Sequence, residues 1–481
     1  MTTQPRPAGA AQPGSGAPAS ALADAAEAEV AAAGVEPTAA ADAAAAELDT
    51  MLAEADRALA SRYPGERRGR QPVHTVYVAA DAFWPGLVAD WGRRALKALE
   101  AWAPDMMAFG RAMDVPLVLA ADVRSRVLAK LIAEPIEDLR LDFEDGYTPA
   151  HDSSPAHDSS PALGGSPAAG GRAPAGVRAA KDADAAEDAD ARAAAAALAD
   201  AIAAGSAPPF TGLRCKSLEP ATRRRAIRTL DLFLGSLLAR GPLPAGFVVT
   251  LPKVTSADQV TAMAHLCDRL EQAHGLRPGQ LVFEVQVETP QVILGADGTA
   301  VVARCVHAAA GRLTGLHYGT YDYSASLGIA AAYQSMDHPA ADHARAVMQV
   351  AAAGTGVRLS DGSSNVLPEG SRDEVVAAWQ LHSTLVRRSL ERGFYQGWDL
   401  HPAQLPSRYA ATYAFFRPGL AVTCARLRSY LGGGQHGVLE EPATARAMAG
   451  YLRRGLDCGG ISQQEVADLA GLDRAGLDLL T

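Results

Sequence analysis

Several short apolar runs of this sequence end in acidic residues that could bind a metal ion. Glu288 and Asp322 each end such a run. Magnesium prefers oxygen ligands and often takes one or two carboxylates, completed by water and substrate oxygens. The pair could therefore hold a divalent cation, with a strand-end ion pair as the alternative for Glu288. Glu284 is a weaker candidate for a metal ligand. His317 is also weaker, because a histidine buried in the fold is the simpler interpretation.

Basic residues at comparable positions could bind the negative charge of a substrate. Arg214 and Lys216 lie within one such run, and Lys253 lies near the end of another. A guanidinium stays protonated and can bind a carboxylate through two nitrogens, whereas an ammonium is a compact point charge. A small carboxylate is therefore a suitable ligand for this part of the chain. For Lys253, an ion pair at a strand end is an equally good interpretation.

Proton transfer requires a further group, and three residues are candidates. Glu144 and Asp145 end one run, and His401 lies near the end of the last run. Histidine titrates near neutral pH, which suits acid or base catalysis. For His401 we favour a structural role, in which the ring bonds to a neighbouring backbone carbonyl.

The elements that must position these residues are short β-branched or aromatic runs separated by helical patterns. The eight runs are 73–80, 138–145, 212–219, 247–254, 281–290, 313–322, 356–365 and 394–402. Their alternation with helical patterns is typical of βα units around a parallel sheet. Eight units predict an α/β fold, a (β/α)8 TIM barrel, in which side chains at the carboxyl ends of the strands meet at one mouth.

Composition divides the chain further. The expected parts are a disordered Ala/Pro-rich arm (1–47), a barrel domain (48–420) with a low-complexity insertion (151–180), and a C-terminal helical segment (421–481). Helices are expected at 48–62 and 181–202. The stretch 151–176 offers no packing face, so we expect that a short linker can replace it. Ser462 and Glu465 have the spacing of a capping box.

Charge and cysteine content exclude several classes of protein. Acidic residues number 54 and basic residues 44, a net charge of −10, which argues against nucleic acid or an anionic membrane as a partner. The sequence has no apolar run long enough for a membrane span and no apolar segment typical of a signal peptide. Five cysteines without a Cys-x-x-Cys pair exclude a zinc ribbon and a dense disulfide framework. A cytoplasmic location is the simplest expectation.

Six motifs occur in an order that resembles a known family. They are LRLDFEDGY, GLRCKS, LPKV, VQVETPQ, GTYDYSASLG and QGWDLHPAQ. This series is similar to that of the HpcH/HpaI aldolase/citrate lyase beta-subunit-like family, which includes malyl-coenzyme A lyases. The resemblance spans about residues 138–418 and is strongest to an uncharacterised branch. It implies a TIM barrel and carbon–carbon lyase chemistry.

The resemblance also implies roles for single residues. Glu288 of VETP and Asp322 of GTYD match the two magnesium-binding carboxylates of the family. Arg214 matches the arginine that holds a substrate carboxylate or carbonyl oxygen, and Lys253 matches the lysine of the LPK motif. Mn²⁺ is an alternative to Mg²⁺.

Two further features lie at the end of the predicted barrel that carries Arg214: an acidic segment that the family shares, and one residue that differs from the family. Asp142, Glu144 and Asp145 match the acidic segment, and we interpret Glu144 and Asp145 as groups that orient water near the metal and tune Arg214. Lys216 stands where the family commonly has asparagine, which would add positive charge to the pocket.

The leading hypothesis is a metal-dependent lyase or aldolase that cleaves or forms a hydroxy acid through an enolate. A coenzyme A thioester substrate stays open. We expect a homo-oligomer in which the C-terminal segment covers an active site, often that of a neighbour. A non-catalytic barrel that binds a dicarboxylate or a protein partner is the alternative. Phosphoryl transfer is a third possibility, but no phosphohistidine loop or nucleotide motif supports it.

Overall fold

A computed structural model describes residues 39–147, 175–432 and 441–480. The chain divides into two compact units, Met1–Arg62 and Tyr63–Thr481. The described part of the first unit is one helix, α2 (Ala39–Arg62). It begins before the expected start at residue 48, because the preceding alanine-rich stretch also favours helix. The expected disordered arm 1–47 was therefore too long. The expectation for the insertion 151–176 lies almost entirely outside the described residues.

The second unit is built on eight parallel strands. They are β1 (His74–Ala79), β2 (Asp138–Asp142), β3 (Phe210–Arg214), β4 (Phe247–Leu251), β5 (Val282–Val287), β6 (Leu313–Tyr318), β7 (Arg358–Ser360) and β8 (Gly397–Asp399). Their order in the sheet is β7-β6-β5-β4-β3-β2-β1-β8. A parallel bridge between Ser360 and Gln396 brings the two outer strands together. The predicted (β/α)8 TIM barrel is confirmed.

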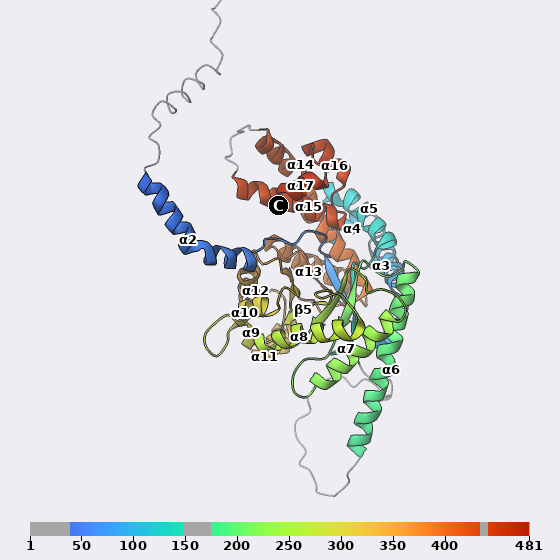
Figure 1. Cartoon of the computed structure of the whole chain (residues 1–481). Coiled ribbons are helices and arrows are strands. Elements are labelled where there is room, and N and C mark those ends of the chain that lie inside the picture. The colour runs from blue at the N-terminus through green and yellow to red at the C-terminus, as the bar shows by residue number, and fades with distance from the viewer. Residues whose placement is uncertain (1–38, 148–174, 433–440, 481) are drawn as a thin grey trace, which may run out of the picture. The chain divides into compact units, whose positions relative to one another are not determined.

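Helices surround the strands (Figure 1). Those between β1 and β5 are α3 (Leu87–Trp102), α4 (Met106–Ala112), α5 (Leu117–Ala133), α6 (Ala175–Ala203), α7 (Arg223–Leu238) and α8 (Ala257–His274). Those after β5 are α9 (Pro290–Ile293), α10 (Val301–Ala308), α11 (Thr320–Ser326), α12 (Pro339–Ala352) and α13 (Arg372–Glu391). Short 3-10 helices lie at Ala80–Ala82, Ala331–Tyr333 and Pro402–Gln404. The helix expected at 181–202 is confirmed as part of α6.

Apolar packing between helices and strands positions the barrel. Phe233 of α7 stacks on Phe247 of β4, with ring centres 6.2 Å apart, and its edge meets Phe143 just after β2. These rings are buried in one continuous hydrophobic core. Burial of such aromatic side chains contributes most of the favourable free energy of folding at this contact.

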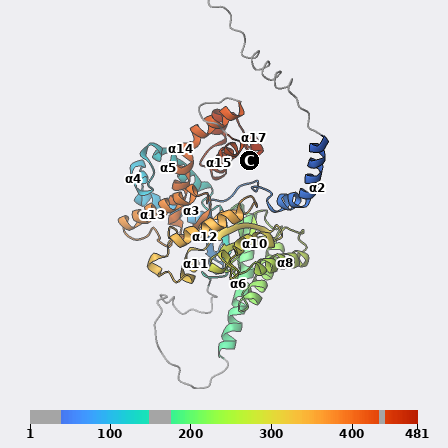
Figure 2. The same ribbon diagram turned by 90° about the vertical axis from the view of Figure 1, so that its left-hand side faces the viewer.

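The C-terminal extension consists of α14 (Leu405–Leu431), α15 (Pro442–Cys458), α16 (Gln463–Ala470) and α17 (Arg474–Leu480). The expected boundary between residues 420 and 421 lies inside α14, so it does not separate two structural parts. Figures 1 and 2 show these helices grouped beside α4 and α5. The predicted capping box of Ser462 and Glu465 is confirmed at the start of α16.

The extension is attached to the barrel helices by charge. Glu465 accepts hydrogen bonds from Arg417 of α14 at 2.6 Å and from Arg126 of α5 at 3.2 Å. Burial tends to raise the pKa of Glu465, but its hydrogen bonds with Ser462 and Arg417 and the charge of Arg126 outweigh burial and lower the pKa to about 2.

Glu465→Gln should therefore lower the melting temperature at pH 7 by about 1–3 °C. A carboxylate whose pKa is depressed on folding stabilises the fold above its unfolded pKa and loses that contribution as the pH falls through the folded value. The difference between the two proteins should shrink as the pH falls from about 4.5 toward 2. Melting curves across this range test it, and a difference independent of pH would contradict the charge-based explanation.

Two further expectations concern membranes and disulfides. None of the helices within the described residues combines the length and apolar character needed to cross a membrane. All five cysteines are free and buried, as expected for a chain without a disulfide framework.

Candidate active site

The interior of the barrel contains a buried ion pair below the mouth. Arg140 on β2 contacts Glu284 on β5 at 3.1 Å, and His317 on β6 lies 3.0 Å from the same carboxylate oxygen. Since β2 and β5 are not neighbours in the sheet, both side chains must point inward. Burial would raise the pKa of Glu284, but Arg140 and His317 outweigh it and lower the pKa. The weaker metal candidates Glu284 and His317 are thus engaged with each other and with Arg140.

Alternation along the strands carries further residues to the mouth. Asp142 ends β2 four positions after Asp138, on the inward face, and is paired in register with Arg214 at the end of β3. Arg214 donates from Nε to Oδ1 of Asp142 at 2.7 Å and from Nη2 to Oδ2 at 2.5 Å. Its guanidinium carbon lies 4.8 Å from the centre of the Tyr77 ring. Arg214 is therefore oriented by a carboxylate and by an aromatic face.

One nitrogen of Arg214 faces the mouth. Nη1 lies 3.3 Å from Glu144, 3.6 Å from Asp145 and 3.5 Å from the side-chain oxygen of Gln286. Burial opposes the positive charge, but Asp142 and Glu144 outweigh it and raise the pKa of Arg214. The guanidinium therefore stays charged at any pH at which the protein is folded.

Lys253 joins acidic groups from different parts of the mouth. Its Nζ lies 3.0 Å from Glu144, 3.0 Å from Asp145 and 3.1 Å from Asp322. Its backbone N–H donates to Oε1 of Glu288 at 2.6 Å. The φ angle of Lys253 is +52°, a strained value for a residue with a side chain. This conformation lets one residue contact four carboxylates through its backbone and its side chain.

Glu288 and Asp322 meet across the ends of β5 and β6. Glu288 is 2% exposed, and burial together with the negative charge of Asp322 raises its pKa to about 7. Asp322 lies in the first turn of α11, which Gly319 precedes. A Cβ on Gly319 would lie 2.5 Å from the Cβ of Glu288, so glycine is needed for this close approach.

Glu144 can hold a proton near neutral pH. Burial, followed by the hydrogen bond and charge of Asp145, raises the pKa of Glu144 to about 8. Burial also acts to raise the pKa of Asp145, but Glu144, Arg214 and Lys253 outweigh it and lower that pKa. Two adjacent carboxyl groups with pKa values pushed apart are typical of a pair in which one carries the proton and the other stays ionised.

The mouth has more negative than positive charge. Its carboxylates are Asp142, Glu144, Asp145, Glu288 and Asp322, and its cations are Arg214 and Lys253. Within the described ranges, no three His, Cys, Asp or Glu side chains are arranged as a metal site. Two carboxylates suffice for magnesium, because it retains several waters. The donor set of Glu288 and Asp322 therefore fits a divalent cation that the excess charge would attract.

Two residues that the sequence offered as candidates for the site, Lys216 and His401, contact other groups. Lys216 follows β3; its Nζ donates to the carbonyl of Phe143 at 2.7 Å and lies 3.5 Å from Glu187 of α6. Its contacts are thus with a different set of groups from those of Arg214. His401 caps the short helix at Pro402–Gln404 and accepts from the backbone N–H of Ala403 at 3.2 Å. The expected bond from His401 to a backbone carbonyl is therefore wrong: the ring accepts a hydrogen bond from a backbone N–H and caps the helix.

Some residues of the site were not predicted. Gln286 is one of them, and for Asp142, which matches the acidic segment of the family, the pairing with Arg214 was not predicted. Both lie on the inward faces of β2 and β5, where alternation with Arg140 and Glu288 is the signal that could have indicated their position. Tyr77 looks like any apolar residue of a strand, so its place against Arg214 had no signal in the sequence.

The fold and the mouth together define a TIM-barrel protein with a mixed acidic and basic site at the carboxyl ends of its strands. The chain belongs to the family described as Domain of unknown function (DUF6986), whose model matches residues 52–175 and 176–481. No curated protein matches the chain.

Several solved structures are similar to this chain. A Haloferax volcanii malate synthase with glyoxylate is 14% identical, with 72% of this chain and 76% of that chain covered and a TM-score of 0.42. The protein CitE from Mycobacterium tuberculosis, in complex with magnesium, acetoacetate and coenzyme A, is 17% identical over 81% and 99%, with a TM-score of 0.41. An HpcH/HpaI aldolase/citrate lyase family protein from Burkholderia cenocepacia J2315 is 18% identical over 46% and 85%, with a TM-score of 0.30. The fold assignment rests on the strand order of this chain itself.

Proposed function

We propose that this protein is a magnesium-dependent carbon–carbon lyase, or a condensing enzyme working in the reverse direction, on a small hydroxy acid. The supporting observation is the convergence of Arg214, Glu144 and the pair Glu288–Asp322 at the carboxyl ends of β2, β3, β5 and β6. The sequence motifs that carry these residues support the same reaction class.

Glu288 and Asp322 would hold the metal ion. The raised pKa of Glu288 reflects burial and a neighbouring negative charge, and a bound cation would relieve both. Mg²⁺, when bound, supplies positive charge that stabilises negative charge developing on substrate oxygens.

Arg214 would bind the substrate carboxylate or the developing enolate oxygen through Nη1. Asp142 engages its other two nitrogens and so fixes the direction of Nη1. A preoriented donor of this kind needs no reorganisation during the reaction, which is the main advantage of an enzyme site over water. Lys253 would add a second positive charge beside the substrate. The contacts of Lys216 lead us to propose no substrate role for it.

Glu144 would carry the proton. In the cleavage direction its carboxylate accepts the proton of the substrate hydroxyl as the C–O double bond forms and the adjacent C–C bond breaks. The electron pair of that bond stays on the departing fragment as an enolate, which a proton then quenches. In the condensation direction the protonated Glu144 returns its proton to the new alkoxide. A pKa of about 8 allows both forms near neutral pH.

A ligand screen tests the function. Melting temperature should be measured with short dicarboxylates, 2-oxo acids including glyoxylate, acetoacetate and acyl-coenzyme A compounds, each with and without Mg²⁺. We expect stabilisation that requires Mg²⁺, is lost in Glu288→Gln, and is accompanied by formation of a keto acid or a new hydroxy acid. Magnesium-dependent binding of a dicarboxylate without any product would indicate the non-catalytic alternative. No stabilisation by any of these compounds would contradict both.

A further inference from the structure

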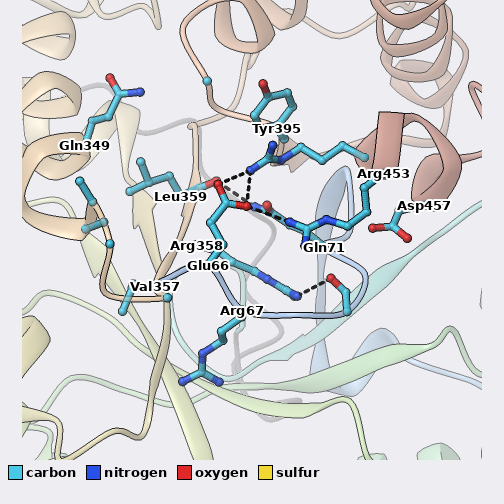
Figure 3. Close-up of a pocket in the computed structure, with 17 residues that line it drawn as sticks. Glu66, Arg67, Gln71, Gln349, Val357, Arg358, Leu359, Tyr395, Arg453 and Asp457 are labelled. Atoms are coloured by element: carbon cyan, nitrogen blue, oxygen red, sulfur yellow. Dashed lines mark hydrogen bonds and ion pairs between the residues drawn. The ribbon is translucent and has the colours of Figure 1, made fainter. Parts of the chain in front are cut away.

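A pocket lies at the end of the barrel opposite the mouth, and Figure 3 shows the residues that line it. It is lined by residues that precede strands or begin them: Gln71 before β1, Arg358 at the start of β7 and Tyr395 before β8. Arg453 and Arg454 of α15 complete the wall. Because all eight strands are parallel, this end is remote from the carboxyl ends that carry Arg214 and Glu288. The pocket encloses about 200 Å³.

Arginines outnumber acids among the residues that line this pocket. The four arginines are Arg67, Arg358, Arg453 and Arg454, and the two acids are Glu66 and Asp457. Glu66 is shared, at 2.8 Å from Arg453 and 2.9 Å from Arg454. Asp457 is paired with Arg474 at 2.5 Å, outside the lining. The acids of the pocket are therefore already engaged with other arginines, and among the residues that the structure describes Arg67 and Arg358 have no acid within ion-pair distance.

Arg358 and Arg67 have neutral partners. Arg358 donates to the carbonyl of Gly69 at 3.0 Å, and Arg67 donates to the carbonyl of Leu313 at 3.1 Å. Carbonyl oxygens satisfy hydrogen bonds but do not neutralise a charge. Burial, and then the positive charge of Arg67, lower the pKa of Arg358 to about 10. A half-buried guanidinium among other guanidiniums is unfavourable unless an anion joins it.

We propose that this pocket binds a small organic anion with at least two negative charges. Phosphate and carboxylate groups can each accept two parallel hydrogen bonds from the planar guanidinium group of arginine. Tyr395 stacks against Arg454, 4.4 Å from its ring centre to the guanidinium carbon, and so gives one wall a rigid face. The volume is below the roughly 300–1,000 Å³ of pockets for drug-sized ligands, so the anion is compact. A phosphate ester and a polycarboxylate are the two sources of this chemistry.

Such an anion would join the barrel to its extension. Arg358 belongs to β7, whereas Arg453 and Arg454 belong to α15. A ligand that contacts both would bind the folded chain and not the unfolded one, and would raise the melting temperature accordingly. This site is separate from the proposed catalytic mouth, so its test is independent of the proposed reaction.

Calorimetric titration of the full chain tests the proposal. The probes are inorganic phosphate, pyrophosphate and citrate, without Mg²⁺ and at constant ionic strength. We expect pyrophosphate or citrate to bind and Arg358→Gln to weaken binding by about 10- to 100-fold, because a charge-assisted hydrogen bond is lost. Arg304→Gln is the matched control, since Arg304 of α10 is 56% exposed and lies outside the pocket. It should bind as tightly as the parent chain.

The outcomes separate the possibilities. Binding of pyrophosphate alone indicates a phosphate ester, and binding of citrate alone indicates a polycarboxylate. Binding that Arg358→Gln leaves unchanged, or that Arg214→Lys abolishes, would locate the anion elsewhere and overturn the proposal, as would no binding of any probe. If Arg358→Gln melts at a much lower temperature, Arg454→Gln replaces it, because Arg454 is more exposed than its neighbour Arg453.

Discussion

Arg214→Lys should lower turnover by about 10²–10³-fold while leaving Mg²⁺ binding unchanged. Arg214 engages Asp142 through two nitrogens and presents Nη1 to the mouth. Lysine keeps the charge but has one nitrogen, so it cannot pair with Asp142 and also contact a substrate oxygen in a fixed direction. Steady-state kinetics with the substrate found in the screen measure the loss, and calorimetry measures Mg²⁺ affinity.

The buried pair with Asp142 means that Arg214→Lys will also lose some stability, and a matched control separates the two effects. Arg312 is equally buried, at 6% exposed, and pairs with Glu271 through two nitrogens at 2.7 and 2.8 Å. It precedes β6 and therefore lies at the opposite end of the barrel. Arg312→Lys should lower the melting temperature by a similar amount and leave turnover nearly unchanged. Equal losses of turnover in both variants would show that Arg214 acts through the fold.

The barrel was predictable because short runs with β-branched or aromatic residues alternate with helical patterns along the chain and end in polar residues. Each of the eight expected runs overlaps a strand, but several runs extend past its end. The run 212–219 overlaps only the end of β3 and extends past it. β3 ends at Arg214 because its neighbour β2 ends at Asp142, the residue paired with Arg214. The run 356–365 contains the three residues of β7, after which Asp361 bonds to Arg345 of α12. Strand ends depend on neighbours that periodicity does not reveal.

The site was predictable where position in a βα unit determines it. Residues at the carboxyl ends of parallel strands must converge, and Glu144, Asp145, Arg214 and Lys253 do contact one another. The position of a residue in a βα unit does not determine which groups its side chain contacts. Lys216 therefore contacts Phe143 and Glu187 instead of the groups around Arg214. The anion pocket was not predictable either. Its arginines come from three distant parts of the sequence: Arg67 precedes β1, Arg358 begins β7, and Arg453 and Arg454 lie on α15.

Glu288→Gln and Asp322→Asn should each weaken Mg²⁺ binding by about 10²-fold or more. One unit charge 4 Å from another contributes about 4 kcal/mol at an effective dielectric constant of 20, and the charge of the metal is double. Calorimetric titration at pH 8, above the pKa of about 7 of Glu288, keeps that carboxylate largely ionised. Asp231→Asn is the control, because Asp231 is 51% exposed on α7 and pairs with His274. Unchanged affinity in both mouth variants would contradict the metal assignment.

Substitution of Lys253 should strengthen Mg²⁺ binding, the opposite of the effect expected for the two carboxylates. Its ammonium lies about as close to Glu144, Asp145 and Asp322 as a hydrogen bond allows, so it already neutralises part of the charge that would attract a metal. Lys253→Gln removes this competing cation but keeps the backbone N–H that contacts Glu288. We therefore expect Lys253→Gln to bind Mg²⁺ more tightly than the parent chain, and to lose the gain when Asp322→Asn is added. Weaker binding in Lys253→Gln alone would mean that the strained backbone at this position, and not the charge balance, determines how Glu288 meets the metal.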